Sequence, residues 1–340
     1  YNNLNYFPDD ANVKFDFHFG IKGVVSIART DKRYMRRIRL ENINYFSLQG
    51  SYDSDEASFF GFRQYQRIKF TDSVFNFKSG LYVHRANHGQ FNSVWGRIDG
   101  GPPNSWLLNI KPLIANDEQQ QIAKVYVSAF AEAVLHNNLQ YIDLFKNAAA
   151  AADWLPNVAL LNTYSDSKVQ SIANFEEDIE LTSGSTKNVT LLGEGLKIWR
   201  EETLKFRDED TQGNNAVILG WDNSQDSSKQ LPRYRFSFLK AMDMNSISDL
   251  FISLAAGNTA ELDKEKSEGK KTEPKEIPVN FTIQLEDSLG QQARIELNAI
   301  KRLVPRLKIQ FDKLDLLQDN YGSLWEPAFE TVEIPLAGVE

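Results

Sequence analysis

The fold of this chain is decided by the stretch at residues 43–53, INYFSLQGSYD. Its first six residues form a short, mostly apolar run, which is typical of a strand buried in a parallel sheet. The run stops at Gln49 and Gly50, and glycine and small polar residues favour a loop. We therefore predict a buried strand over residues 43–48, followed by a loop that contains Asp53.

Two similar runs flank this strand in the sequence. Residues 21–28 (IKGVVSIA) precede it, and residues 78–84 (KSGLYVH) follow it. Between the last two runs, residues 57–68 have the spacing of one helix face, and a longer apolar stripe predicts a helix over residues 117–135. Strands alternating with helices predict the α/β class, in which neighbouring parallel strands are joined by crossover helices.

The pattern changes at about residue 156. Residues 279–286 and 293–297 alternate between apolar and polar side chains, with Gly290 in the turn between them. This period of two is that of half-buried strands, and similar short runs recur with little helix between them. Many short strands separated by turns predict an all-β second domain, a sandwich or jelly roll.

We accordingly predict two domains, residues 1–155 and residues 156–340. Within the second domain, residues 258–276 are rich in Lys and Glu and lack aromatic residues. Such a segment cannot bury much apolar area, so we predict a solvated connection between strands. The chain starts at Tyr1 rather than at a methionine, and we expect its natural beginning to lie upstream.

Composition and charge exclude several classes of partner. The net charge of -8 argues against nucleic acid as a main partner, because a phosphate-binding surface is basic. No run approaches the roughly 20 apolar residues that a membrane-spanning helix needs. The chain has no cysteine, which excludes disulfides and thiol catalysis, and it has no phosphate-binding glycine motif, so we predict no cofactor.

Two short patterns resemble metal sites. His84 and His88 have the spacing of a helical zinc pair, but Arg85 stands where the motif needs glutamate, and we predict no zinc site. Residues 208–213, DEDTQG, imitate the start of an EF-hand loop, but Leu219 stands where a bidentate carboxylate is needed. A calcium site in the second domain is therefore an alternative to a plain turn.

The residues with the clearest chemical potential are Asp53 and His88. Each follows a predicted parallel strand at its carboxyl end, where such folds place ligands and catalytic groups. A carboxylate there would hold the imidazole in one tautomer and stabilise its cation while the imidazole takes a proton from a serine. Taken alone, Asp53 also fits a residue that caps the following helix or ties the turn, and His88 fits a turn residue. Their joint placement favours an acid–base pair, with Asp55 as the alternative acid.

Several motifs around these two residues resemble a known family. They resemble a group of large bacterial α/β-hydrolase-fold proteins, similar to dienelactone-hydrolase-type and acetylhydrolase-type esterases, over roughly residues 1–135. The matching motifs are GSYDSD (residues 50–55), RQY (63–65), ANHGQFN (86–92) and VWG (94–96), and residues 19–28 resemble the sixth strand of that fold.

The resemblance implies Asp53 as the catalytic acid and His88 as the catalytic base of a serine hydrolase. It also implies an upstream Gly-x-Ser-x-Gly elbow, which this sequence lacks. We therefore expect part of a secreted, periplasmic or cell-surface hydrolase for small-molecule or polymer esters, inactive without its serine. The chain departs from the family at Gln49, where histidine is usual, and at Arg29, where proline is frequent.

The alternative is a binding protein. In that interpretation the first domain is a scaffold, and the β-sandwich recognises a glycan or another protein. Trp199, Trp221 and Trp325 are the candidates for stacking on sugars.

Overall fold

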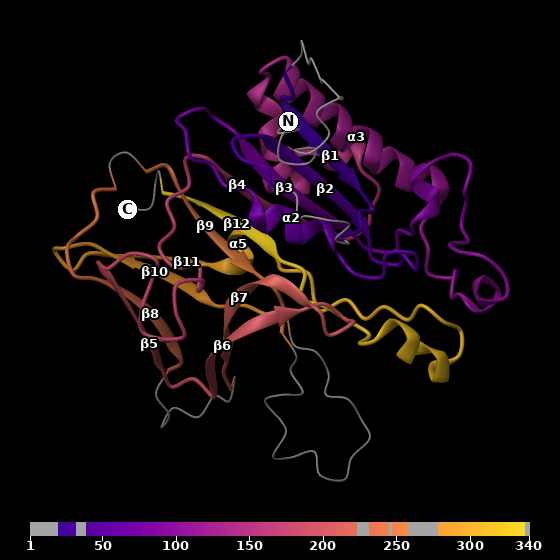
Figure 1. The fold of residues 1–340 in the computed structure, drawn as a ribbon. Coiled ribbons are helices and arrows are strands. Elements are labelled where there is room, and N and C mark those ends of the chain that lie inside the picture. The colour runs from indigo at the N-terminus through magenta and orange to yellow at the C-terminus, as the bar shows by residue number, and fades with distance from the viewer. Residues whose placement is uncertain (1–19, 32–38, 223–230, 245–246, 258–277, 337–340) are drawn as a thin grey trace, which may run out of the picture. The chain divides into compact units, whose positions relative to one another are not determined.

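The computed structural model describes residues 20–31, 39–222, 231–244, 247–257 and 278–336 (Figure 1). The chain forms two compact units. Unit 1 contains residues 1–168 and 311–314, and unit 2 contains residues 169–310 and 315–340. The predicted solvated connection at 258–276 lies outside the described residues.

Unit 1 is built on a mixed four-stranded sheet with the order β1-β2-β3-β4. The first three strands are parallel and β4 is antiparallel to β3. Their bounds are β1 Gly23–Ile27, β2 Asn44–Gly50, β3 Phe77–Val83 and β4 Leu160–Asp166. The three predicted parallel strands are thus confirmed as neighbours in one sheet.

The fourth strand changes the predicted division of the chain. We predicted that the first domain ends at residue 155, whereas β4 at 160–166 pairs with β3 over its full length. Leu161 and Tyr164 of β4 are buried. The boundary between the units therefore lies after Lys168, because an apolar strand that completes a sheet cannot be assigned to another core.

Helices cover both faces of this sheet (Figure 1). Tyr45 and Phe46 are consecutive on β2 and so point to opposite faces. The hydroxyl of Tyr45 donates to the carbonyl of Gly61 in α2, and Phe46 stacks on Tyr126 of α3 at 5.6 Å between ring centroids. The α-helices are α2 Gly61–Arg67, α3 Asn116–Leu135 and α4 Ile142–Lys146, and the 3-10 helices are η1 Gly89–Phe91, η2 Asn104–Leu107, η3 Leu139–Tyr141 and η4 Ala148–Trp154.

The α3 face of the sheet carries an aromatic core. Phe77 of β3 packs against Phe130 of α3 at 5.6 Å and against Phe145 of α4 at 5.1 Å. The predicted apolar stripe of the long helix is confirmed at five of its six residues, which are buried, while Val125 is half-buried; the buried ones are Ile122, Tyr126, Ala129, Phe130 and Ala133. None of the described helices is long and apolar enough to cross a membrane.

Unit 2 consists mainly of short antiparallel strands in pairs, as the alternating pattern predicts. The described pairs are β5 with β8, β6 with β7, β9 with β12 and β10 with β11. Their bounds are β5 Val189–Glu194, β6 Ile198–Lys205, β7 Thr211–Gly220, β8 Arg233–Phe238, β9 Asp249–Leu254, β10 Thr282–Glu286, β11 Gln292–Glu296 and β12 Glu330–Pro335, with α5 Leu297–Ile300 and η6 Asp315–Tyr321. The hairpin around Gly290 is confirmed, because Glu286 pairs with Gln292 and Gly290 has a φ of 80°.

The segment that imitates the start of a calcium loop lies at a tight turn of unit 2. Residues 206–210 form the turn between β6 and β7, closed by a hydrogen bond from Phe206 N–H to the carbonyl of Asp210 at 2.8 Å, and residues 211–213 already belong to β7. Across the described ranges, no group of three or more His, Asp or Glu side chains could hold a metal ion.

Candidate active site

The candidate site lies where β2 and β3 end side by side. Gly50 at the end of β2 pairs with Val83 at the end of β3. The loops that follow remain joined, because Ser51 N–H donates to the carbonyl of Val83 at 2.9 Å and Tyr52 N–H donates to that of Ala86 at 2.8 Å. A Cβ atom on Gly50 would lie 2.4 Å from the carbonyl oxygen of Ala86, so this approach of the loops requires glycine.

These two loops bring Asp53 and His88 together. Asp53 Oδ2 lies 2.9 Å from Nδ1 of His88, which is a hydrogen-bonding distance. The Asp53 side chain is fully buried, whereas 19% of the His88 side chain is exposed. Asp55, the alternative acid, instead donates its backbone N–H to Asp53 Oδ1 at 3.1 Å. Of the two acids, the structure therefore pairs Asp53 with the imidazole.

The Asp53 carboxylate is fixed by its own loop as well. It accepts hydrogen bonds from the backbone N–H groups of Asp55 and Glu56, the latter at 2.8 Å. The side-chain amide of Gln49 donates to Asp53 Oδ2 and to the carbonyl of Glu56, both at 2.9 Å. The turn-forming role that Asp53 fits in isolation and the pairing with His88 are therefore fulfilled by the same carboxylate.

Burial and pairing shift the ionisation of both groups. Loss of water raises the pKa of Asp53 to about 6, although its hydrogen bond to His88 and the charge of that residue oppose the rise. The hydrogen bond to Asp53 raises the pKa of His88 to about 9, against the opposing effect of burial. The bond between the two groups thus favours the carboxylate and the imidazolium together, while burial favours the neutral form of each.

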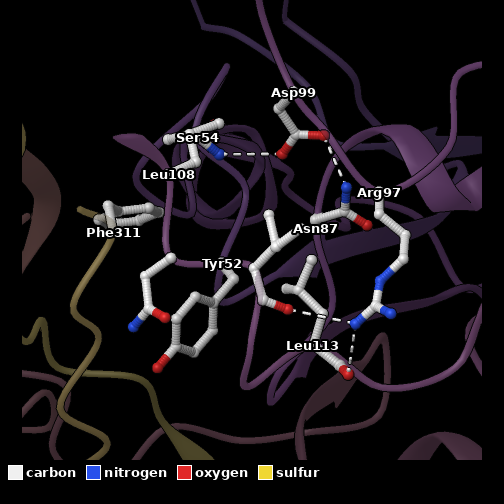
Figure 2. Close-up of a pocket in the computed structure, with 10 residues that line it drawn as sticks. Tyr52, Ser54, Asn87, Arg97, Asp99, Leu108, Leu113 and Phe311 are labelled. Carbon is white, nitrogen blue, oxygen red and sulfur yellow. Dashed lines mark hydrogen bonds between the residues drawn. The ribbon is translucent and has the colours of Figure 1, made fainter. Parts of the chain in front are cut away.

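A second carboxylate, that of Asp99, links the two loops by hydrogen bonds. Asp99 is 5% exposed and accepts backbone N–H groups of His88 at 3.0 Å, Gly89 at 2.9 Å and Ser54 at 3.2 Å. It also accepts the side-chain amide of Asn87 at 2.7 Å, and Figure 2 shows the bonds to Ser54 and Asn87. Burial raises the pKa of the Asp99 carboxyl. The sequence analysis missed this residue, because it lies in an irregular segment without a periodic pattern.

Helix α3 supports the histidine loop through Gln119, another residue that the sequence analysis missed as part of the site. Its fully buried amide donates to the carbonyl of Asn87 at 2.7 Å and accepts the N–H of the same residue at 3.1 Å. The loop residue before His88 is thus hydrogen-bonded through its peptide groups to the first turns of α3. In the sequence nothing distinguishes Gln119 from the polar residues next to it in the predicted helix. Only its full burial in the structure marks it as part of the site.

The exposed side of the histidine is flanked by Trp95. The indole and the imidazole are parallel within 5°, with ring centroids 5.7 Å apart. Asn92 fixes this turn, because its side-chain oxygen accepts the N–H groups of Val94 and Trp95 at 2.8 and 2.9 Å. Trp95 is 65% exposed, so an apolar surface is available beside the imidazole.

No nucleophile accompanies the pair in the described part of the chain. There, the hydrogen bond of the His88 ring is the one from Nδ1 to Asp53, and no serine or threonine hydroxyl is hydrogen-bonded to Nε2. Ser51 is close in sequence to Asp53 but is buried, and its Oγ accepts the N–H of Arg85 at 2.9 Å. The same Oγ lies 3.4 Å from Nδ1 of His84, whose pKa is lowered to about 4 by burial and by the charge of Arg85.

A small pocket lies beside the site but does not open on the acid–base pair (Figure 2). Arg97 on its wall donates to the carbonyl groups of Ile110 and Leu113 at 3.2 and 3.3 Å. Asp53 and His88 are not among the lining residues, which are Tyr52, Ser54, Asn87, Arg97, Asp99, Leu108, Asn109, Ile110, Leu113 and Phe311.

The three tryptophans suggested for glycan stacking are half-buried in unit 2. Trp199 packs against Tyr234 and Trp221 against Phe281, each with ring centroids 6.4 Å apart. Trp325 lies beneath the guanidinium of Arg306 at 5.2 Å. The most exposed tryptophans among the described residues are in unit 1, namely Trp95, Trp106 and Trp154.

No protein-family model, curated protein or solved structure matches this chain.

Proposed function

We propose that unit 1 supplies the acid–base half of a serine-type ester hydrolase of the α/β-hydrolase fold. The observation that carries the proposal is the 2.9 Å bond between a fully buried carboxylate, Asp53, and a partly exposed imidazole, His88. This pair follows adjacent parallel strands, and no described hydroxyl or carboxylate is bonded to Nε2 of the imidazole. Such an arrangement matches the way a triad acid orients its base.

In the proposed mechanism, Asp53 accepts the Nδ1–H of His88 and leaves Nε2 as the basic nitrogen. Nε2 takes the proton of a serine hydroxyl as the serine oxygen bonds to the ester carbonyl carbon. The imidazolium then gives that proton to the departing alkoxide. Water attacks the acyl-enzyme in the same way, releasing the carboxylic acid and restoring the serine.

We propose that the serine comes from outside residues 1–340 and that these residues alone are inactive. Support comes from the lack of a hydroxyl bonded to His88 within the described part of the chain. In this proposal the antiparallel strands of unit 2 form a β-sandwich attached to a hydrolase that works outside the cell or at its surface.

The test compares the 340-residue chain with a protein that includes the natural sequence upstream of Tyr1. We expect no serine-dependent hydrolysis of p-nitrophenyl esters by the shorter chain and clear hydrolysis by the longer one. His88→Ala in the longer protein should lower kcat by about 10⁴-fold or more, because the base is lost. His136→Ala is the matched control, since that side chain is 66% exposed and lies just after the end of α3.

Two outcomes would contradict the proposal. Turnover by the 340-residue chain, blocked by a fluorophosphonate that labels one of its own serines, would place the nucleophile within these residues. A longer protein that is folded but hydrolyses no ester would favour the binding-protein alternative.

A further inference from the structure

We propose that Asp99 is a positioning residue that holds the backbone of His88 so that its imidazole meets Asp53. The inference rests on the proposed function, because the alignment of these two groups matters for a working acid–base pair. Asp99 does not touch the imidazole itself; it acts through the peptide groups on either side of it.

The hydrogen bonds of Asp99 are distributed over both of its oxygens. Oδ1 accepts Gly89 N–H and the amide of Asn87, while Oδ2 accepts His88 N–H and Ser54 N–H. Three of the four donors belong to the histidine loop and one belongs to the Asp53 loop. Hydrogen bonds to an ionised, buried carboxylate are among the strongest that a side chain makes.

These bonds close a ring around the candidate pair. Ser54 is covalently linked to Asp53, its N–H binds Asp99, Asp99 binds the N–H of His88, and the His88 ring returns to Asp53. Within such a ring the backbone of the histidine cannot move away from the acid without breaking a charge-assisted bond. Asp53 is fixed separately by Gln49 and the following turn, so Asp99 supplies the constraint on the histidine side.

A carboxylate is the side chain that this position requires. All four hydrogen-bonding partners of Asp99 are N–H donors, two on each oxygen. Both oxygens must therefore be acceptors, as they are in a carboxylate. In Asp99→Asn the new amide group would face two N–H donors, which leaves buried donors unpaired. The substitution preserves the size of the side chain and so tests the bonds rather than the packing.

The experiment follows the His88 ring by NMR in the 340-residue chain, which contains only four histidines. The wild type should show a far-downfield proton shared by His88 and Asp53, and a titration above that of an ordinary histidine. In Asp99→Asn we expect the downfield proton to be lost and the pKa of His88 to fall, because the imidazole no longer aligns with its acid. In a protein that hydrolyses esters, kcat should fall about 10- to 100-fold with little change in KM.

Asp31→Asn is the matched control. Asp31 also accepts two hydrogen bonds, from Arg67 at 2.6 and 2.9 Å, but it contacts neither loop of the site. It should lower stability without changing the downfield proton or the His88 titration. If Asp99→Asn does not fold, Asn87→Ala removes one donor to Asp99 and should cause the same changes to a smaller extent.

The positioning role is overturned if the folded variants keep both the downfield proton and the wild-type titration of His88. These readings need no substrate and no serine. A chain that hydrolyses no ester but loses the His88 signals in Asp99→Asn would therefore contradict the proposed function while supporting the role of Asp99.

Discussion

At the scale of single residues, the site depends on how Asp53 is surrounded. The carboxylate is fully buried, yet it receives hydrogen bonds from Gln49, from two backbone N–H groups and from His88. Burial alone would favour the neutral acid, whereas these donors favour the ion. The amide of Gln49 is the side-chain donor next to the imidazole, so the acid is supported by its own strand end as well as by His88.

The pair predicts a displaced pH dependence for ester hydrolysis. A base must be unprotonated, and the pKa of His88 is raised to about 9, chiefly by its hydrogen bond to Asp53. Activity should therefore rise with pH until about 9, rather than level off above the ordinary histidine value of about 6.5. Measurement of kcat/KM from acid to alkaline pH in the active protein checks this.

Asp53→Asn serves as the companion variant. Loss of the acceptor should move the midpoint of the profile to lower pH and reduce kcat by about 10⁴-fold. A wild-type midpoint at the ordinary histidine value would mean that the bond seen between Asp53 and His88 does not govern the reaction.

At the scale of elements, the site exists because β2 and β3 are parallel neighbours. The loops that follow these two strands approach each other most closely at Gly50. A methyl group there would meet the carbonyl of Ala86 at 2.4 Å, and that atom belongs to the backbone and cannot rotate away. We expect Gly50→Ala to lower the free energy of unfolding by about 1–3 kcal/mol and to separate Asp53 from His88. Urea denaturation and the downfield His88 proton measure the two effects.

Gly101→Ala is the control for this substitution. No atom lies within 4 Å of a Cβ built on Gly101, so the added methyl group should leave stability and the proton signal nearly unchanged. Equal behaviour of the two variants would show that the loops after β2 and β3 can separate freely.

At the scale of the whole molecule, we expect a substitution that destabilises one unit to leave the other unit folded. In unit 2, Arg207 and Glu326 are both about 1% exposed at their side chains, and they form a buried ion pair at 3.7 Å. Glu326→Ala leaves the arginine charge in the core, and we expect unit 2 to lose about 3–5 kcal/mol of stability. The downfield proton of His88 in unit 1 should persist when unit 2 unfolds.

Glu202→Ala provides the comparison, because Glu202 also pairs with an arginine but is 44% exposed. It should change stability by less than about 1 kcal/mol. If Glu326→Ala abolishes the His88 signal at the same denaturant concentration at which unit 2 unfolds, the units fold as one and the division is wrong.

The sequence by itself determined the three parallel strands of unit 1 and placed the loops of Asp53 and His88 side by side. Apolar runs and alternation report which faces of a segment are buried, and such signals are local. Since consecutive parallel strands usually lie side by side, residues just past their carboxyl ends could be placed together without knowledge of the rest of the chain. The hairpin around Gly290 was found in the same way.

Only the tertiary structure decided what surrounds that pair. Nothing local marks β4 as the antiparallel edge of the first sheet, or Asp99 and Gln119 as supports of the histidine loop. The clearest case is Leu108, which forms an antiparallel bridge with Asp312 and so draws residues 311–314 into unit 1. Such partners are chosen by burial and hydrogen bonding across long separations in the chain, and these energies depend on the folded surroundings rather than on neighbouring residues.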